Sequence, residues 1–162
     1  MADEFLGIYL NDHLAGSVVA IELLQHIERA YVGRPVERFA ADLRAEIQAD
    51  QQELQRLMGE LNVTESRARQ ATAWLTEKMT MIKLRLDDWA GGDFRLFEAL
   101  EAISLGIEGK KSLWVVLAGA TEKLPALGLL DYSRLVERAL DQRGRVEAKR
   151  LETANAVLVP AR

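Results

Sequence analysis

The chain of 162 residues contains no cysteine. This absence excludes disulfide bonds, thiolate catalysis, and cysteine-ligated zinc or iron–sulfur clusters. Proline is also scarce, with three residues, and aromatic side chains make up 6% of the chain. Because proline breaks helices, and because alanine, leucine, glutamate, arginine and glutamine are abundant, the composition predicts an all-α protein.

The sequence also lacks a long apolar run. The longest, LAGSVVAI from Leu14 to Ile21, is far shorter than the roughly 20 residues that a membrane span needs. The net charge of −4 shows no positive excess of the kind that binds nucleic acid. The opening residues MADEFLG carry acidic side chains and no basic segment typical of a signal peptide. We therefore expect a cytoplasmic protein with neither a nucleic-acid nor a membrane partner.

A chain of this length is typical of one domain, here residues 1–162. Helix-breaking and capping residues predict five helices, over 3–31, 35–61, 64–89, 93–123 and 131–158. Gly33 is the expected cap of the first helix, and Pro35 the first residue of the second. Asp93 and Asp131 are the expected N-caps of the fourth and fifth helices.

Core residues recur in alternating steps of four and three along the first four helices, which is the spacing of a near-parallel, left-handed bundle. In helix 3–31 the line is Leu6, Leu10, His13, Ser17, Ala20, Leu24, Ile27 and Tyr31. In helix 35–61 it is Val36, Ala40, Leu43, Ile47, Asp50, Leu54, Leu57 and Leu61. Helix 64–89 is either a fifth bundle member or a crossover that returns the chain along a four-helix core made by the other helices.

This arrangement resembles the ferritin-like superfamily, and in particular its uncharacterised bacterial members with stretches such as YLNDHLAG (residues 9–16) and LGIEGKKSLW (residues 105–114). The resemblance implies a four-helix core with one long crossover connection. Di-iron members of the superfamily bind metal through Glu-x-x-His pairs on two helices and a Glu from each of the other two. This chain contains no Glu-x-x-His, so we expect neither a metal nor another cofactor.

A divergent iron or manganese site is the alternative. Glu22 and His26 stand one turn apart on a face of helix 3–31 that is nearly opposite the core line. Carboxylates from helices 35–61 and 93–123 would complete the ligand set. The candidate ligands are Glu22, His26, Glu53, Glu101 and Glu108. We favour a surface ion pair or hydrogen bond for Glu22 and His26 over half of an intersubunit metal site.

Polar residues interrupt the core lines near the middle of three helices, at His13, Asp50 and Lys110. If the first two helices pair about Gly33, Ser17 faces Asp50 and His13 lies one turn away. A buried carboxylate needs a partner, because an isolated buried charge costs several kcal/mol. We therefore predict a buried network of His13, Ser17, Asp50 and Lys110 that fixes helix register. A His–Asp general base is the catalytic alternative, but no nucleophile motif or phosphate-binding loop accompanies it.

Helix 3–31 is apolar on a second face as well. The residues on that face are Ile8, Ala15, Val19 and Leu23. A helix with two apolar faces is either central or lies at an oligomer interface, and we expect a homodimer through this helix. A strip of small residues on helix 93–123, which includes Gly106 and Gly109, indicates close helix packing.

These patterns favour a non-catalytic bundle with a structural or protein-interaction role. A metal-binding or oxidative-stress function is the alternative that the superfamily implies. The methionine and tryptophan content leaves a third possibility, a bundle that binds a small apolar ligand in its core.

Overall fold

The structure is a computed structural model, and it describes residues 2–65 and 92–159. The elements in these ranges are α1 (Ala2–Ala30), α2 (Pro35–Glu60), α4 (Gly92–Ala120), the short 3₁₀ helix η2 (Pro125–Leu129) and α5 (Tyr132–Leu158). All are helical, which confirms the predicted fold class, and the four long helices end within three residues of the predicted positions. Nearly all of the predicted helix 64–89, and with it the question of a crossover, lies outside the described residues.

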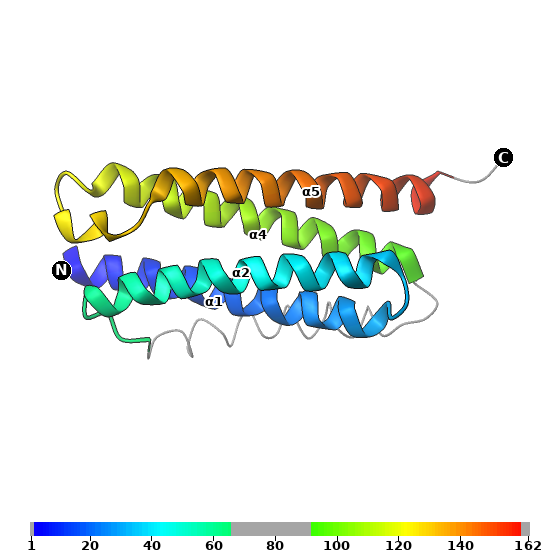
Figure 1. Cartoon of the computed structure of the whole chain (residues 1–162), viewed down its shortest axis with the longest axis horizontal. Helices are drawn as coiled ribbons and strands as arrows, with labels where there is room; N and C mark the ends of the chain where they lie inside the picture. Colours follow the sequence, from blue (N-terminus) through cyan, green and yellow to red (C-terminus); the bar gives the residue numbers. More distant parts are fainter. Residues whose placement is uncertain (1, 66–91, 160–162) are drawn as a thin grey trace.

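Two helical hairpins form the bundle (Figure 1). In one, α1 packs against α2, and in the other α4 packs against α5. The hairpins pack against each other through α1 and α4, and side chains of α2 also pair with those of α5. The end of α2 and the start of α4 lie at opposite ends of the molecule, so these two helices run in the same direction (Figure 1).

The turn between α1 and α2 depends on Gly33 and Pro35, as predicted. Gly33 has a φ of +79°, which only glycine adopts without a steric penalty. Pro35 is the first residue of α2, where its missing N–H costs nothing. The Tyr31 hydroxyl donates to the Gly92 carbonyl at 2.9 Å, and so the end of α1 is tied to the start of α4.

The two predicted aspartate caps differ in outcome. Asp131 caps α5, because its carboxylate accepts a hydrogen bond from the Arg134 backbone N–H at 3.0 Å. The prediction for Asp93 is wrong: α4 begins one residue earlier, at Gly92, and Asp93 lies within the first turn. Its carboxylate is instead paired with Arg34 of the α1–α2 turn, at 2.6 Å.

The hydrophobic core has two parts, and all four long helices contribute to both. One cluster lies toward the α1–α2 turn and includes Ile27 and Ile47, and the other lies toward η2 and includes Leu54 and Leu117. The predicted core line of α2 is confirmed, since its residues from Val36 to Leu57 are buried. Asp50 lies on this line between the two clusters.

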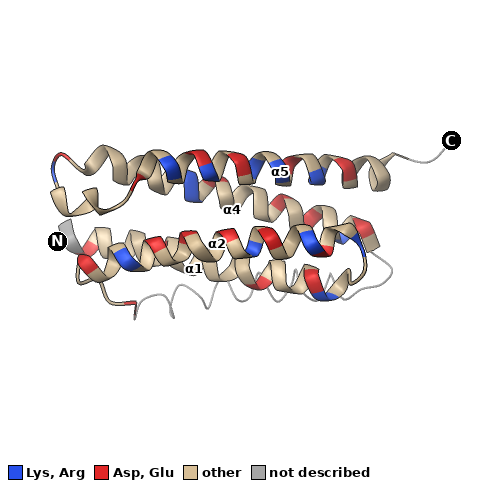
Figure 2. Ribbon diagram, in the orientation of Figure 1, with Lys and Arg blue, Asp and Glu red and all other residues tan. Residues whose placement is uncertain are grey.

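Basic and acidic side chains are interspersed along α2 and α5 (Figure 2). Some of them form ion pairs between the two helices, Arg145 with Glu46 at 2.6 Å and Arg134 with Glu53 at 2.7 Å. None of the described helices combines the length and apolarity needed to cross a bilayer.

Candidate functional site

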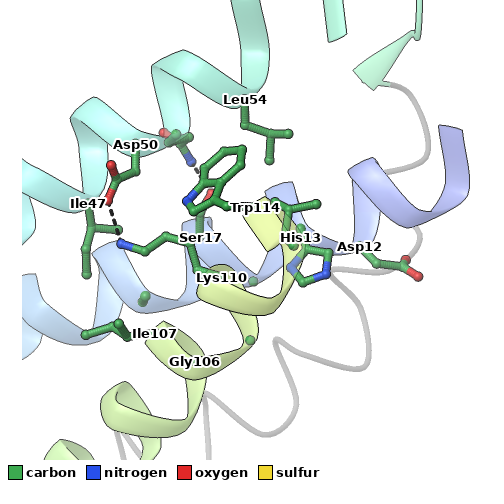
Figure 3. Close-up of a pocket in the computed structure, with 15 residues that line it drawn as sticks. Asp12, His13, Ser17, Ile47, Asp50, Leu54, Gly106, Ile107, Lys110 and Trp114 are labelled. Atoms are coloured by element: carbon green, nitrogen blue, oxygen red, sulfur yellow. Dashed lines mark hydrogen bonds and ion pairs between the residues drawn. The ribbon is translucent and has the colours of Figure 1, made fainter. Parts of the chain in front are cut away.

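A polar layer made of Asp50, Lys110, Arg138 and Gln142 crosses the bundle between the two apolar clusters. The Asp50 residue is only 2% exposed. Lys110 of α4 places its Nζ 2.5 Å from Asp50 Oδ2 (Figure 3). From α5, Arg138 donates through Nε to Asp50 Oδ1 at 2.8 Å, and Gln142 donates through Nε2 to Asp50 Oδ2 at 3.2 Å. One carboxylate of α2 therefore binds both helices of the other hairpin.

The polar layer pairs this one carboxylate with two cations, Lys110 and Arg138, so it carries one positive charge in excess. Burial lowers the pKa of the Lys110 amine, and the Asp50 carboxylate opposes that shift. The neighbouring acids Glu46 and Glu53 are bound to arginines of α5. The Glu46 carboxylate nevertheless opposes the fall in the Lys110 pKa, so it offsets part of the positive charge of the layer.

The structure brings together only part of the predicted network. Lys110 binds Asp50, whereas Ser17 accepts a hydrogen bond from Gln51 Nε2 at 2.8 Å and donates to the Leu14 carbonyl at 2.6 Å. His13 stacks edge-on against Tyr9, with 4.7 Å between the ring centroids. Ser17 and His13 therefore lie beside the polar layer, on the wall of an adjacent cavity.

Sequence reasoning missed Arg138 and Gln142, which complete the layer from α5. The sequence pattern gave no line of core residues for the predicted helix 131–158, so it did not show which of its side chains face the bundle. A signal was present, because Leu135, Ala139 and Val146 are apolar and occupy helical spacing on the face that also carries Gln142.

A cavity of about 240 Å³ lies between α1, α2 and α4, beside the polar layer. Asp50 and Lys110 form part of its wall, together with His13 and Ser17 (Figure 3). Much of the remaining wall is apolar and comes from Ala20, Ile47, Leu54, Ile107, Leu113 and the indole of Trp114. The cavity thus joins a mostly apolar space to a charged cluster.

Trp114 is 1% exposed and lies on the cavity wall. Its Nε1–H finds no hydrogen-bond acceptor among the described residues. In Figure 3 the five-membered ring that carries Nε1 lies on the side of the indole nearer Ser17. A buried N–H without a partner costs about 1–3 kcal/mol, so native proteins rarely leave one unmatched. The Nε1 atom is itself enclosed by its surroundings, and the indole contributes its ring to the cavity wall.

Three glycines also lie on the cavity wall: Gly16 of α1, and Gly106 and Gly109 of α4. A Cβ built at any of them would meet no described atom within 4 Å. The interpretation of the α4 small-residue strip as close packing is therefore not supported at Gly106 and Gly109. At these positions no neighbouring atom of residues 2–65 or 92–159 packs where a side chain would be.

His13 lies on the same wall as a half-buried side chain. Burial lowers the pKa of its imidazole below the usual 6.5, although the nearby Asp12 carboxylate opposes the shift. The neutral form of the ring is therefore favoured in the folded protein. Asp12 itself is exposed at the cavity wall, where solvent screens its charge.

The candidate metal ligands do not gather into one site. Arginine or lysine side chains bind three of them: Arg134 binds Glu53, Arg150 binds Glu101, and Lys111 binds Glu108. Glu22 is exposed on α1 and His26 is half-buried. Over residues 2–65 and 92–159, no three histidine, aspartate or glutamate side chains are placed to hold a metal ion.

The second apolar face of α1, on which the homodimer prediction rests, is largely covered within the chain. Ala15 and Leu23 are buried, with exposures of 0% and 2%, and Ile8 and Val19 are half-buried. A helix with two apolar faces lies either in the centre of a bundle or at an oligomer interface, and these exposures fit a central helix. The homodimer stays a prediction.

The cavity and the polar layer together make up the candidate functional site: a mostly apolar space between three helices, beside a buried cluster of charged side chains. Comparison with known proteins finds no family model, no curated protein and no solved structure that matches this chain.

Proposed function

We propose that the chain is a non-enzymatic helical bundle of ferritin-like topology that binds a small molecule in the cavity between α1, α2 and α4. The topology is supported by the directions of the helices. Two antiparallel hairpins are joined so that α2 and α4 run in the same direction, as in bundles with one long crossover connection.

The observation that carries the binding function is the cavity of about 240 Å³, whose wall is mostly apolar and includes Asp50 and Lys110. Binding sites for small molecules are typically apolar spaces with a few placed polar groups, and they are common between the helices of bundles. A ligand would bury its apolar part against Leu54, Ile107 and Leu113.

The same geometry argues for binding rather than catalysis. The Ser17 hydroxyl is not poised as a nucleophile, because it donates to the Leu14 carbonyl. A His13–Asp50 base is not formed either, since both Asp50 oxygens accept hydrogen bonds from Lys110, Arg138 and Gln142. Every charged side chain of the layer is thus committed to a structural bond.

Iron or manganese binding, the alternative that the ferritin resemblance implies, gains no support from the polar layer. At the level where the layer crosses the bundle, α4 and α5 present Lys110 and Arg138. Two cationic side chains around one carboxylate repel a metal cation instead of ligating it.

Binding is tested by titrating the protein with 3-phenylpropan-1-ol and 3-phenylpropionate, two small compounds that share an apolar body. Two-dimensional ¹H–¹⁵N NMR follows the indole N–H resonances of the three tryptophans. The Trp114 resonance is assigned by its disappearance in Trp114→Phe. We expect at least one compound to shift that resonance, because Trp114 lies on the cavity wall and a bound ligand changes its surroundings.

A cavity-filling variant with a matched control locates the binding. Gly109→Leu places a side chain where a built Cβ meets no described atom, whereas Gly144→Leu makes the same change on an exposed face of α5 outside the cavity. We expect binding to weaken by roughly tenfold in the first variant and to stay unchanged in the second. If neither compound shifts the Trp114 resonance, the proposed function is wrong.

A further inference from the structure

The cavity between α1, α2 and α4 has an exposed side and a buried side. On the exposed side, which we call the mouth, lie Asp12 and Gly16 of α1 and Gly106 of α4. A ligand in the cavity therefore has an outer part near the mouth and a deeper part against α2 and α4. The buried side consists of residues that are at most 3% exposed: Ile47, Asp50, Leu54, Ile107, Leu113 and Trp114.

Three charged side chains line the cavity: Asp12, Asp50 and Lys110. Asp50 and Lys110 form an ion pair, with 2.5 Å between Oδ2 and Nζ. The Asp12 carboxylate lies at the mouth and points away from this pair (Figure 3), where water screens its charge. The deeper wall thus carries one negative and one positive charge, and these two compensate each other.

The groups of this ion pair are also bonded to other protein groups. Both Asp50 oxygens accept hydrogen bonds from the polar layer, which contributes Lys110, Arg138 and Gln142. The Lys110 ammonium donates to Gln142 Oε1 as well as to Asp50. An ion that enters the cavity therefore meets no unpaired counter-ion on the deeper wall.

Ions of either sign are disfavoured at this depth. A cation would lie against Lys110, with Arg138 as a second positive charge on the other oxygen of Asp50. An anion would lie against the Asp50 carboxylate, and the His13 imidazole supplies no counter-charge, because burial favours its neutral form. An ion that gives up its water without gaining a partner is strongly disfavoured.

The size and lining of the cavity define the rest of the ligand. Its volume of about 240 Å³ exceeds the roughly 150 Å³ of an engineered apolar cavity that binds benzene. Isoleucine and leucine side chains and the indole ring make up much of the wall. Binding is therefore favoured for a molecule that buries hydrocarbon against these groups.

We infer that the ligand is an uncharged molecule with an aromatic or branched aliphatic body, and that the Asp50–Lys110 pair excludes ions of either sign from the cavity. The inference rests on the proposed binding function and adds the chemical class of the ligand. The hydrocarbon body lies against Leu54, Ile107 and Leu113. A polar group such as a hydroxyl stays at the mouth, where it keeps contact with water.

The test compares three compounds that share a phenyl group on a three-carbon chain and differ in the polar head: 3-phenylpropan-1-ol, 3-phenylpropionate and 3-phenylpropylamine. Isothermal titration calorimetry gives their dissociation constants at about pH 7.5, where the acid is ionised and the amine is protonated. We expect the alcohol to bind roughly tenfold more tightly than either ion, because only the alcohol enters without a charge.

Two lysine variants separate the charge on the cavity wall from the overall charge of α4. Lys110→Met removes the cation on the wall and keeps an unbranched side chain, while Arg138 still pairs with Asp50. Lys111→Met removes a neighbouring cation that pairs with Glu108 and does not line the cavity. We expect the disadvantage of the amine relative to the alcohol to fall to roughly threefold or less in the first variant and to persist in the second.

Each result has a distinct meaning. If the acid or the amine binds as tightly as the alcohol, the cavity binds small molecules but the inference of an uncharged ligand is wrong. Equal effects of Lys110→Met and Lys111→Met on amine binding would overturn the role assigned to the Asp50–Lys110 pair. If none of the three compounds binds, the proposed function fails as well. Thermal melting of both variants checks that the fold is retained.

Discussion

His13 lines the cavity as a neutral side chain, because burial lowers the pKa of its imidazole. Two causes act on this pKa in opposite directions. The Asp12 carboxylate favours the protonated imidazole, but burial disfavours it more strongly, so the pKa falls.

This shift predicts how stability depends on pH. Because the folded pKa of His13 lies below the unfolded value of 6.5, the unfolded chain binds more protons between the two values. The free energy of unfolding therefore rises with pH through the window just below 6.5 and falls on acidification. Urea unfolding of the wild type and His13→Gln, compared across that window, measures the effect.

The substitution changes no other titratable side chain, so the difference between the two curves isolates His13. We expect His13→Gln to lose less stability on acidification than the wild type. Parallel curves would mean that the imidazole is equally solvated in the folded and unfolded chain.

At the scale of single helices, α5 depends on its N-cap. The Asp131 side chain satisfies the Arg134 backbone N–H, which has no partner within the helix. We expect Asp131→Ala to lower the free energy of unfolding by about 1 kcal/mol, because one backbone donor at the helix start loses its acceptor. Chemical denaturation measures the change.

The comparison for Asp131→Ala is Asp42→Ala, at an exposed aspartate of α2 whose nearest cation, Arg38, is 3.9 Å away. Its effect should stay within about 0.5 kcal/mol, as is usual for exposed ion pairs. If the two substitutions destabilise the protein equally, the Asp131 hydrogen bond makes no particular contribution.

Helix ends were predictable where residues close in sequence determine them. Gly33, Pro35 and Asp131 act through their own backbone geometry or a neighbouring N–H, and each was correctly assigned from the sequence. Asp93 was not, because its partner, Arg34, comes from a distant part of the chain.

The candidate site was predictable only in part. Asp50 and Lys110 were identified because each interrupts an apolar core line, but the partners of Asp50 on α5 depend on how the two hairpins are placed against each other. The cavity was not predictable, since a glycine in a helix has the same sequence pattern whether a neighbouring backbone or open space lies beside it. Only the positions of the surrounding helices show the open space at Gly109.

For the whole molecule, the polar layer joins the two hairpins across the middle of the core. Asp50→Ala removes the common acceptor of Lys110, Arg138 and Gln142 and leaves two cations facing each other. We expect it to lower the free energy of unfolding by about 3–5 kcal/mol, the range for breaking a buried charge pair. Urea unfolding followed by circular dichroism measures the loss.

A variant in which leucine replaces all four residues of the layer serves as the comparison. It removes the charges together, so no buried cation is left without a partner, and it should be clearly more stable than Asp50→Ala. If both variants are equally destabilised, the loss in Asp50→Ala comes from packing and not from unpaired charge.

The two apolar clusters have a consequence for the unity of the fold. Since α1, α2, α4 and α5 each contribute side chains to both clusters, detaching any one helix uncovers apolar surface on both sides of the polar layer. The layer divides the core along the length of the bundle, but it does not divide the helices into separable groups. A binding cavity can therefore lie in the middle of the bundle while the apolar core at both of its ends keeps the helices together as one cooperative unit.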